Sequence, residues 1–158
     1  MLPFNNWRFI IRHPFYFLAF GCGLGLVPKA PGTVASLCAL VFVWLWFQAN
    51  LSHSWLIGLC GLLFVLGAWS CEIVGRAIGI ADYSGFVIDE IVAMSMILIY
   101  LPFSWSGWLI GFLLFRFIDI TKPWPINQID RRLKNGLGVM LDDAIAAVYV
   151  LIICQLFL

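Results

Sequence analysis

Long apolar runs separated by short polar connections make up most of this chain. A membrane-spanning helix needs ~20 mostly apolar residues. Five runs come near that length, at residues 34–50, 55–71, 86–101, 107–121 and 139–158. Several are short for a span, so we expect their polar ends to lie at headgroup depth. The pattern predicts an all-α, polytopic membrane bundle with about five spanning helices.

The connections between these runs alternate between charged and uncharged. Residues 28–33, 72–85 and 122–138 carry charge, whereas residues 51–54 and 102–106 carry none apart from a histidine. Threading five spans through this alternation places nearly all of the charge on one side of the membrane. By the positive-inside rule, that side is expected to be cytoplasmic.

A shorter apolar run at residues 14–27 follows Arg8 and Arg12 and precedes Lys29. These basic residues must all share the charged side, so we expect the run to form an N-terminal re-entrant or interfacial helix. An ordinary first span with a reversed end is the alternative. The run also imitates a signal peptide, but the charge that follows it and the lack of an A-x-A site favour an uncleaved element.

Composition agrees with a membrane location. The 158 residues are 63% hydrophobic and 11% charged, with a mean hydropathy of +1.02, and we expect residues 1–158 to form a single membrane-embedded domain. A formal net charge of +1 lacks the excess of Lys and Arg expected of a nucleic-acid-binding protein. The five cysteines show no CxxC spacing, so we expect free, buried thiols instead of disulfides or a zinc site.

Acidic residues lie at the predicted helix ends on the charged side, where desolvation makes them costly and therefore indicative of function. They are Asp89, Glu90, Asp119, Asp142 and Asp143. Carboxylates from three helices that converge at one depth supply hard oxygen ligands, which suit magnesium better than zinc. The alternative for each pair of neighbouring acids is a solvated helix start that complements the helix dipole.

Basic residues are interleaved with these acids. Arg116 and Lys122 stand three residues before and after Asp119, so Arg116 shares a helical face with that acid. Arg116 could form an ion pair with Asp119 or bind phosphate, whereas for Lys122 phosphate binding is favoured. Lys29 and Thr33 mark a second phosphate candidate. We expect Thr33 to cap the following helix, whose free N–H groups would bind an anion.

The spacing of the nucleophiles argues against a covalent phosphoenzyme. Cys71 and Arg76 form a C-x4-R sequence, one residue short of the loop of cysteine phosphatases, and both histidines lie outside the acidic set. The sequence after Asp119 lacks the second aspartate of a DxDx(T/V) phosphatase motif. Attack by water, activated by a metal ion and a carboxylate, is the remaining route to phosphate hydrolysis.

Together these segments resemble the phosphatidylglycerophosphatase A family of bacterial inner membranes, from about Phe20 to the C-terminus. The resemblance rests on Gly23-Leu24, Pro31-Gly32-Thr33, Ser36-Leu37, Asp89-Glu90, Phe115-Arg116-Phe117-Ile118-Asp119, Lys122-Pro123-Trp124-Pro125-Ile126, Asp130-Arg131 and Gly136-Leu137-Gly138-Val139-Met140-Leu141-Asp142-Asp143. KPWPI followed by GxGxMxDD is the most specific combination. Family members often have glycine where this chain has Ala35, Ala93, Asn135 and Ala147.

The resemblance implies a magnesium-dependent lipid phosphatase that hydrolyses phosphatidylglycerophosphate to phosphatidylglycerol and inorganic phosphate at the cytoplasmic leaflet. We expect metal binding and catalysis from Asp89, Glu90, Asp119, Asp142 and Asp143, and catalysis also from Lys122. Phosphate contacts are expected from Lys29, Thr33, Arg116 and Lys122, with Arg131 and Asp130 in a second tier. The implied partners are the lipid substrate and the bilayer, without nucleic acid.

Two other functions share part of this pattern. A phospholipid-synthesising phosphotransferase also uses aspartates and magnesium at the membrane surface, but it should show a D-x2-D-G-x2-A-R type of sequence, which is absent. A cation transporter should hold its acids near the membrane midplane with openings to both sides. The acids of this chain are instead expected at one end of the bundle.

Overall fold

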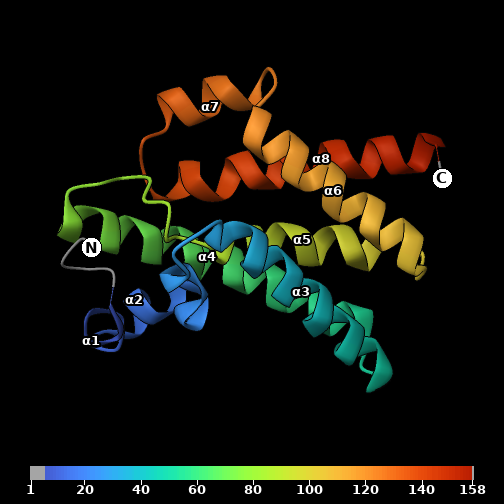
Figure 1. Cartoon of the computed structure of the whole chain (residues 1–158), viewed down its shortest axis with the longest axis horizontal. Coiled ribbons are helices and arrows are strands. Elements are labelled where there is room, and N and C mark those ends of the chain that lie inside the picture. The colour runs from blue at the N-terminus through green and yellow to red at the C-terminus, as the bar shows by residue number, and fades with distance from the viewer. Residues whose placement is uncertain (1–5, 158) are drawn as a thin grey trace.

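The computed structural model describes residues 6–157, and these fold into helices without any strand (Figure 1). Five long helices form a bundle: α3 (Pro31–Gln48), α4 (His53–Ile78), α5 (Ile88–Tyr100), α6 (Trp105–Thr121) and α8 (Gly136–Phe157). The short helices are α1 (Trp7–Ile10), α2 (Pro14–Ala19), the 3-10 helix η1 (Gly21–Leu26) and α7 (Ile126–Arg132). The prediction of an all-α membrane bundle is confirmed.

Three of the long helices, α3, α4 and α8, are long and apolar enough to cross a membrane. The other two, α5 and α6, have 13 and 17 residues, which at ~1.5 Å per residue is shorter than the ~30 Å hydrocarbon core. Both helices lie where membrane spans were predicted. By length and composition, however, only three of the five predicted spans meet the requirement for crossing a membrane. Since α5 contacts α3, α4, α6 and α8, protein instead of lipid surrounds this short central helix.

Consecutive long helices run in opposite directions, so the starts of α3, α5 and α8 meet the ends of α4 and α6 (left in Figure 1). We call this the charged end of the bundle. The connections at the opposite end, residues 49–52 and 101–104, contain no Asp, Glu, Lys or Arg. The alternation of charged and uncharged connections therefore identifies correctly which helix ends come together.

The apolar run at residues 14–27 is not one helix. α2 ends at Ala19, and η1 is interrupted where Gly21, Cys22 and Gly23 all have positive φ. The two pieces pack against the segment before α5, where the carbonyl oxygen of Ala19 accepts a hydrogen bond of 3.0 Å from the Val87 N–H. Neither piece is long enough to span, so two short packed helices replace the single re-entrant or interfacial helix that was expected.

The start of α3 differs from its prediction. Ala30 is the N-cap residue, with φ +49°, and Pro31 occupies the first helical turn, a position where proline is favoured. Thr33 lies inside the helix, and the N-cap makes no side-chain hydrogen bond. The expectation that Thr33 caps this helix is therefore wrong, because proline shifts the helix start upstream of it.

Two of the connections predicted as charged are partly helical. α7 lies within residues 122–138, and α4 continues to Ile78 instead of ending near Cys71. The side chain of Ile88, the first residue of α5, lies level with Gly67 on α4, where an added Cβ would be 3.2 Å from Ile88 Cγ1. α4 therefore extends well beyond the start of α5 at the charged end.

This extension of α4 brings Glu72 to the start of α8. The Gly136 N–H donates a hydrogen bond of 2.8 Å to Glu72 Oε2, and Arg76 Nε donates one of 2.7 Å to Glu72 Oε1. A Cβ on Gly136 would lie 2.0 Å from the carbonyl oxygen of Ala68, so only glycine permits this approach. Glu72 thus satisfies a free N–H at the N-terminus of the helix that carries two of the acids.

Replacing Glu72 by alanine is expected to lower the free energy of unfolding by about 1 kcal/mol, because the Gly136 N–H loses its acceptor. Arg76→Ala is the matched control, because it removes an exposed partner of Glu72 but leaves the hydrogen bond from the Gly136 N–H in place. Thermal unfolding in detergent should show a lower Tm for Glu72→Ala than for Arg76→Ala. An equal Tm for the two variants would contradict the capping role of Glu72.

Each of the five cysteines is free, as predicted. Cys60, Cys71 and Cys154 are buried, whereas Cys22 and Cys38 are exposed. The expectation that all of them are buried is therefore wrong for Cys22 and Cys38, which lie on the outer surface of the N-terminal segment and of α3.

Candidate active site

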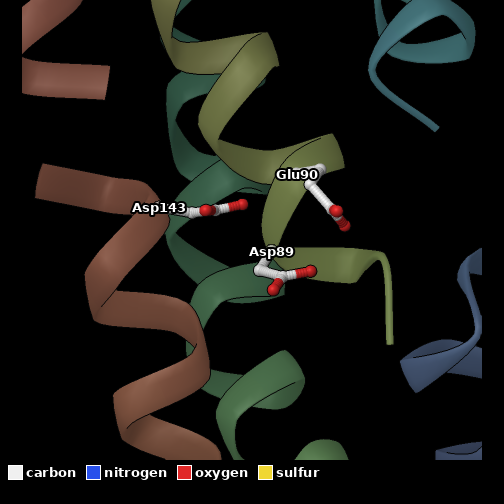
Figure 2. Close-up of side chains that lie close together, drawn as sticks. All are labelled: Asp89, Glu90 and Asp143. Carbon is white, nitrogen blue, oxygen red and sulfur yellow. The ribbon is translucent and has the colours of Figure 1, made fainter. Parts of the chain in front are cut away.

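Three carboxylates from two helices come together at the charged end of the bundle. Asp143 points from α8 toward the first turn of α5, which carries Asp89 and Glu90 (Figure 2). One carboxylate oxygen from each of the three lies within 4.8 Å of the other two. We call these three residues the carboxylate cluster. Asp143 is only 3% exposed, and acids this close together are unfavourable unless a cation or a proton compensates their charge.

Each member of the carboxylate cluster has a buried oxygen without a hydrogen-bond partner among the described residues. These atoms are Asp89 Oδ1, Glu90 Oε2 and Asp143 Oδ2. Buried polar atoms in proteins nearly always have a partner, so three unpartnered oxygens in one place indicate a ligand that the chain itself does not supply. An oxygen-only donor set fits a hard divalent cation such as magnesium and disfavours zinc.

Arg116 lies beside the carboxylate cluster and pairs with acids from two helices. Its Nη1 is 2.8 Å from Asp119 Oδ2 and 3.6 Å from Glu90 Oε1. All three side chains are at most 15% exposed, so these charges are largely shielded from water. The ion pair expected as one alternative for Arg116 is therefore present. Arg116 Nε is buried without a partner among the described residues, which leaves a donor for a bound anion.

Lys122 ends α6 and connects it to α7 and α8. Its ammonium donates hydrogen bonds to Asp142 and, at 2.9 Å, to Asp130 Oδ1. Burial alone would lower the pKa of Lys122, but the hydrogen bonds to these two carboxylates outweigh it and raise the pKa above its ordinary value. The side chain is therefore charged at neutral pH. Asp130, expected in a second tier, holds Lys122 directly.

Asp142 and Asp119 link these ion pairs to the carboxylate cluster. Asp142 Oδ1 accepts a hydrogen bond of 3.0 Å from the backbone N–H of Asp143. Asp119 interacts electrostatically with Glu90, Asp142 and Asp143. The structure thus brings together all five acids singled out in the sequence, with Arg116 and Lys122 among them.

Gly32 places the start of α3 directly against this network. A Cβ on Gly32 would lie 1.8 Å from Glu90 Oε1 and 3.2 Å from Arg116 Nη1. The carbonyl oxygen of Gly32 accepts a buried hydrogen bond of 2.9 Å from Ser36 Oγ. In the sequence, the segment at residues 28–33 was singled out because Thr33 was expected to cap the helix. In the structure, the residue of this segment with a clear role is Gly32.

Lys29 and Arg131 lie at the edge of this arrangement. Both are exposed, and neither forms an ion pair with another described residue, in contrast to Arg116 and Lys122. Thr33 is half-buried in the first turn of α3. The structure therefore does not bring Lys29 or Arg131 into contact with the carboxylate cluster, although their charges remain available to an anion approaching from solution.

This arrangement suits the hydrolysis of a phosphate ester. A hard cation held by the carboxylate cluster can polarise a phosphate oxygen or activate a water molecule. Arg116 and Lys122 lie where they can stabilise the negative charge that builds up on phosphate oxygens. Asp89 and Glu90 lie in the first turn of α5 and Asp119 lies near the end of α6, while the connections at the opposite end contain no Asp, Glu, Lys or Arg. This one-sided arrangement favours an enzyme at a membrane surface over a transporter that opens to both sides.

Comparison with known proteins gives one family. The family model for phosphatidylglycerophosphatase A matches residues 17–158. A phosphatidylglycerophosphatase A of Haemophilus influenzae is 38% identical over 144 residues, covering 90% of this chain and 88% of the relative. The corresponding protein of Escherichia coli is 36% identical over 143 residues, covering 89% and 81%.

A third relative has a different name. A Bacteroides thetaiotaomicron protein, provisionally named a phosphatidylinositol-3-phosphatase, is 35% identical over 136 residues, covering 82% of this chain and 84% of the relative. No solved structure gave a significant match. The residues matched by the family model include the carboxylate cluster, Arg116 and Lys122.

Proposed function

The chain belongs to the phosphatidylglycerophosphatase A family, and from this we propose that it hydrolyses phosphatidylglycerophosphate to phosphatidylglycerol and inorganic phosphate. The observation that carries the proposal is the set of unpartnered buried oxygens on Asp89, Glu90 and Asp143. Beside them lie Arg116 and Lys122, which form ion pairs with other acids. This combination provides a cation site and phosphate-binding charge in one place.

Asp89, Glu90 and Asp143 would hold a magnesium ion, which when bound supplies Lewis acidity toward phosphate and water. Their oxygen-only donor set and their unpartnered atoms support this assignment. Asp119 and Asp142 are already engaged by Arg116 and Lys122. They are therefore less available to a cation than the carboxylate cluster, which leaves them to orient the attacking water and accept its proton, and they complete the five acids of the proposed site.

In the proposed reaction a water oxygen forms a new bond to phosphorus while a carboxylate accepts one proton of that water. The bond between phosphorus and the glycerol oxygen breaks, and the glycerol oxygen leaves with the proton that the water gave up. Arg116 and Lys122 stabilise the charge on the phosphate oxygens during this step. Lys29, Thr33 and Arg131 are further candidates for phosphate contacts. Of these, Lys29 and Arg131 are exposed, which suits the first capture of an anionic headgroup.

We place this reaction at the cytoplasmic face of a bacterial inner membrane. The positive-inside rule supports this orientation, because the basic residues gather at the charged end of the bundle. The named relatives are bacterial proteins. A lipid phosphate fits such a location, since its acyl chains can remain in the bilayer while its phosphate meets the acids.

Another lipid phosphate is the second candidate substrate, because the Bacteroides relative carries the name of a phosphatidylinositol-3-phosphatase. Phosphate release by detergent-solubilised protein separates the candidates. The substrates to compare are phosphatidylglycerophosphate, phosphatidylinositol 3-phosphate, phosphatidic acid and a soluble phosphomonoester. We expect the fastest release from phosphatidylglycerophosphate, loss of activity after chelation with EDTA, and recovery when magnesium is added. No release from any substrate would overturn the proposed function, and full activity after EDTA treatment would overturn the metal assignment.

Replacing Gly32 by alanine is expected to lower kcat/KM by about a hundredfold, because the new methyl group displaces Glu90 and Arg116 from their present positions. Gly58→Ala is the matched control, since a Cβ on Gly58 of α4 meets nothing within 4 Å. Phosphate release should distinguish the two variants, while both should insert into the membrane. Unchanged turnover in Gly32→Ala would contradict the contact between α3 and Glu90.

A further inference from the structure

An apolar groove leads from the carboxylate cluster toward the opposite end of the bundle. Its volume is about 320 Å³, and it lies between α4, α5 and α8. Its lining includes Gly61 and Phe64 of α4, Met96 of α5 and Leu151 of α8. Asp89 is the one charged residue among the described residues that line it. The groove therefore joins a polar end, which belongs to the proposed site, to a continuous apolar wall.

The groove is open at its side and deep at its centre. Ile57 and Val148 at the rim are 37% and 51% exposed, whereas Ala93 and Ala147 in the lining are only 4% exposed. Small side chains such as these leave the space that forms the groove. Two of the helices that bound it, α4 and α8, are long and apolar enough to cross a membrane. The open side therefore faces the acyl chains of the bilayer.

The shape of the groove suits a chain molecule. On α8 its lining runs from Met140 to Leu151, a rise of about 16 Å at 1.5 Å per residue. A slot of this length, apolar along its walls and ending at a carboxylate, matches a phospholipid tail attached to a polar phosphate. It does not suit a soluble metabolite, because the side chains that line it beyond Asp89 offer few hydrogen-bonding groups.

We propose that this groove binds one acyl chain of the phospholipid substrate and so positions the phosphate beside Asp89 and Asp143. This inference rests on the proposed function. Its main benefit is orientation, because a bilayer is as apolar as the groove and the transfer of the chain contributes little binding energy by itself. A chain fixed along α5 limits where the attached phosphate can lie.

Filling the groove tests the proposal. Gly61 lines the groove, and a Cβ on Gly61 meets nothing within 4 Å. Gly58 lies one turn earlier on α4, outside the groove, and a Cβ there is equally unobstructed. Gly61→Phe and Gly58→Phe therefore add the same side chain to the same helix without steric conflict at the Cβ. Only Gly61→Phe should obstruct an acyl chain.

The measurement is kcat/KM for a long-chain lipid phosphate and for a dihexanoyl lipid with the same headgroup. Gly61→Phe is expected to lower kcat/KM about tenfold or more for the long-chain lipid, with a much smaller loss for the dihexanoyl lipid. Gly58→Phe is expected to match the wild type on both. As a direct measure of binding, a lipid phosphate with a photoreactive group in its acyl chain should label Met96 or Leu151.

The outcomes separate the two proposals. If the wild-type protein hydrolyses neither the long-chain nor the dihexanoyl lipid, the proposed function is wrong. If the wild type is active but Gly61→Phe behaves like Gly58→Phe, the groove assignment fails alone. Labelling confined to residues outside the groove would also overturn it. Conversion of a dimer into a monomer by Gly61→Phe would show that a second copy of the chain occupies the groove, which again excludes the acyl chain.

Discussion

Replacing Asp143 by asparagine is expected to abolish phosphate release, with kcat/KM falling by about a thousandfold or more. Asp143 is 3% exposed, belongs to the carboxylate cluster, and has a buried oxygen without a partner among the described residues. Asparagine keeps the shape of the side chain but removes the charge that a cation would need. Asp89→Asn is expected to behave in the same way, because Asp89 has the same kind of unpartnered oxygen.

Metal binding gives a second readout that does not depend on turnover. Magnesium should raise the Tm of the wild-type protein, because a ligand that binds only the folded state stabilises it. Asp143→Asn should lose this increase while its Tm without metal is at least that of the wild type, since a buried unpaired charge has been removed. Glu72→Gln is the matched control, because Glu72 is held by Gly136 and Arg76 outside the carboxylate cluster, so this variant should keep the magnesium-induced increase in Tm. Normal turnover in Asp143→Asn would refute the site assignment.

Replacing Lys122 by methionine is expected to lower kcat/KM by about a hundredfold and to reduce stability. The side chain of Asp142 is only 7% exposed, so it would lose its ammonium partner in a place that water scarcely reaches. The phosphate would also lose a nearby positive charge. The effect should fall mainly on kcat if Lys122 stabilises the transition state, and mainly on KM if it only captures substrate.

Lys134→Met provides the comparison for Lys122. Lys134 also approaches Asp130, at 3.4 Å, but its side chain is 53% exposed, so its loss should change activity and Tm little. Lys122→Arg should recover part of the activity, because it restores the charge with a different geometry. If Lys122→Met and Lys134→Met had equal activity, Lys122 would have no special role at the site.

The helix positions and the meeting of their charged ends could be predicted because both depend on local signals. Apolar runs mark the helices, and the charge of each connection marks its side of the membrane. Several runs are visibly short for a span in the sequence, but the packing of α3, α4, α6 and α8 around α5 is a tertiary feature that no local signal predicts. The break at Cys22 is flanked by Gly21 and Gly23, which also have positive φ. These glycines permit a break, but the positive φ of Cys22 itself has no sequence signal.

The acids, Arg116 and Lys122 could be found from sequence because ionisable residues in membrane helices are uncommon and costly. The roles of Gly32 and Glu72 could not be found from the sequence. Gly32 matters through its contact with Glu90, and Glu72 through a hydrogen bond to a residue 64 positions away. A glycine next to a helix-starting proline, or a glutamate on an exposed helical turn, has no local feature that indicates such a long-range contact.

The extension of α4 past the start of α5 has a kinetic consequence. Ile88 packs at the level of Gly67, whereas α4 continues to Ile78, a further rise of about 16 Å. The acids at the start of α5 are thus recessed below the outermost part of the protein. A lipid that meets them at this depth keeps its tails among its neighbours in the leaflet. The enzyme then responds to the mole fraction of substrate in the membrane, so diluting that substrate with inert phospholipid should slow turnover even when its amount per volume of buffer is constant.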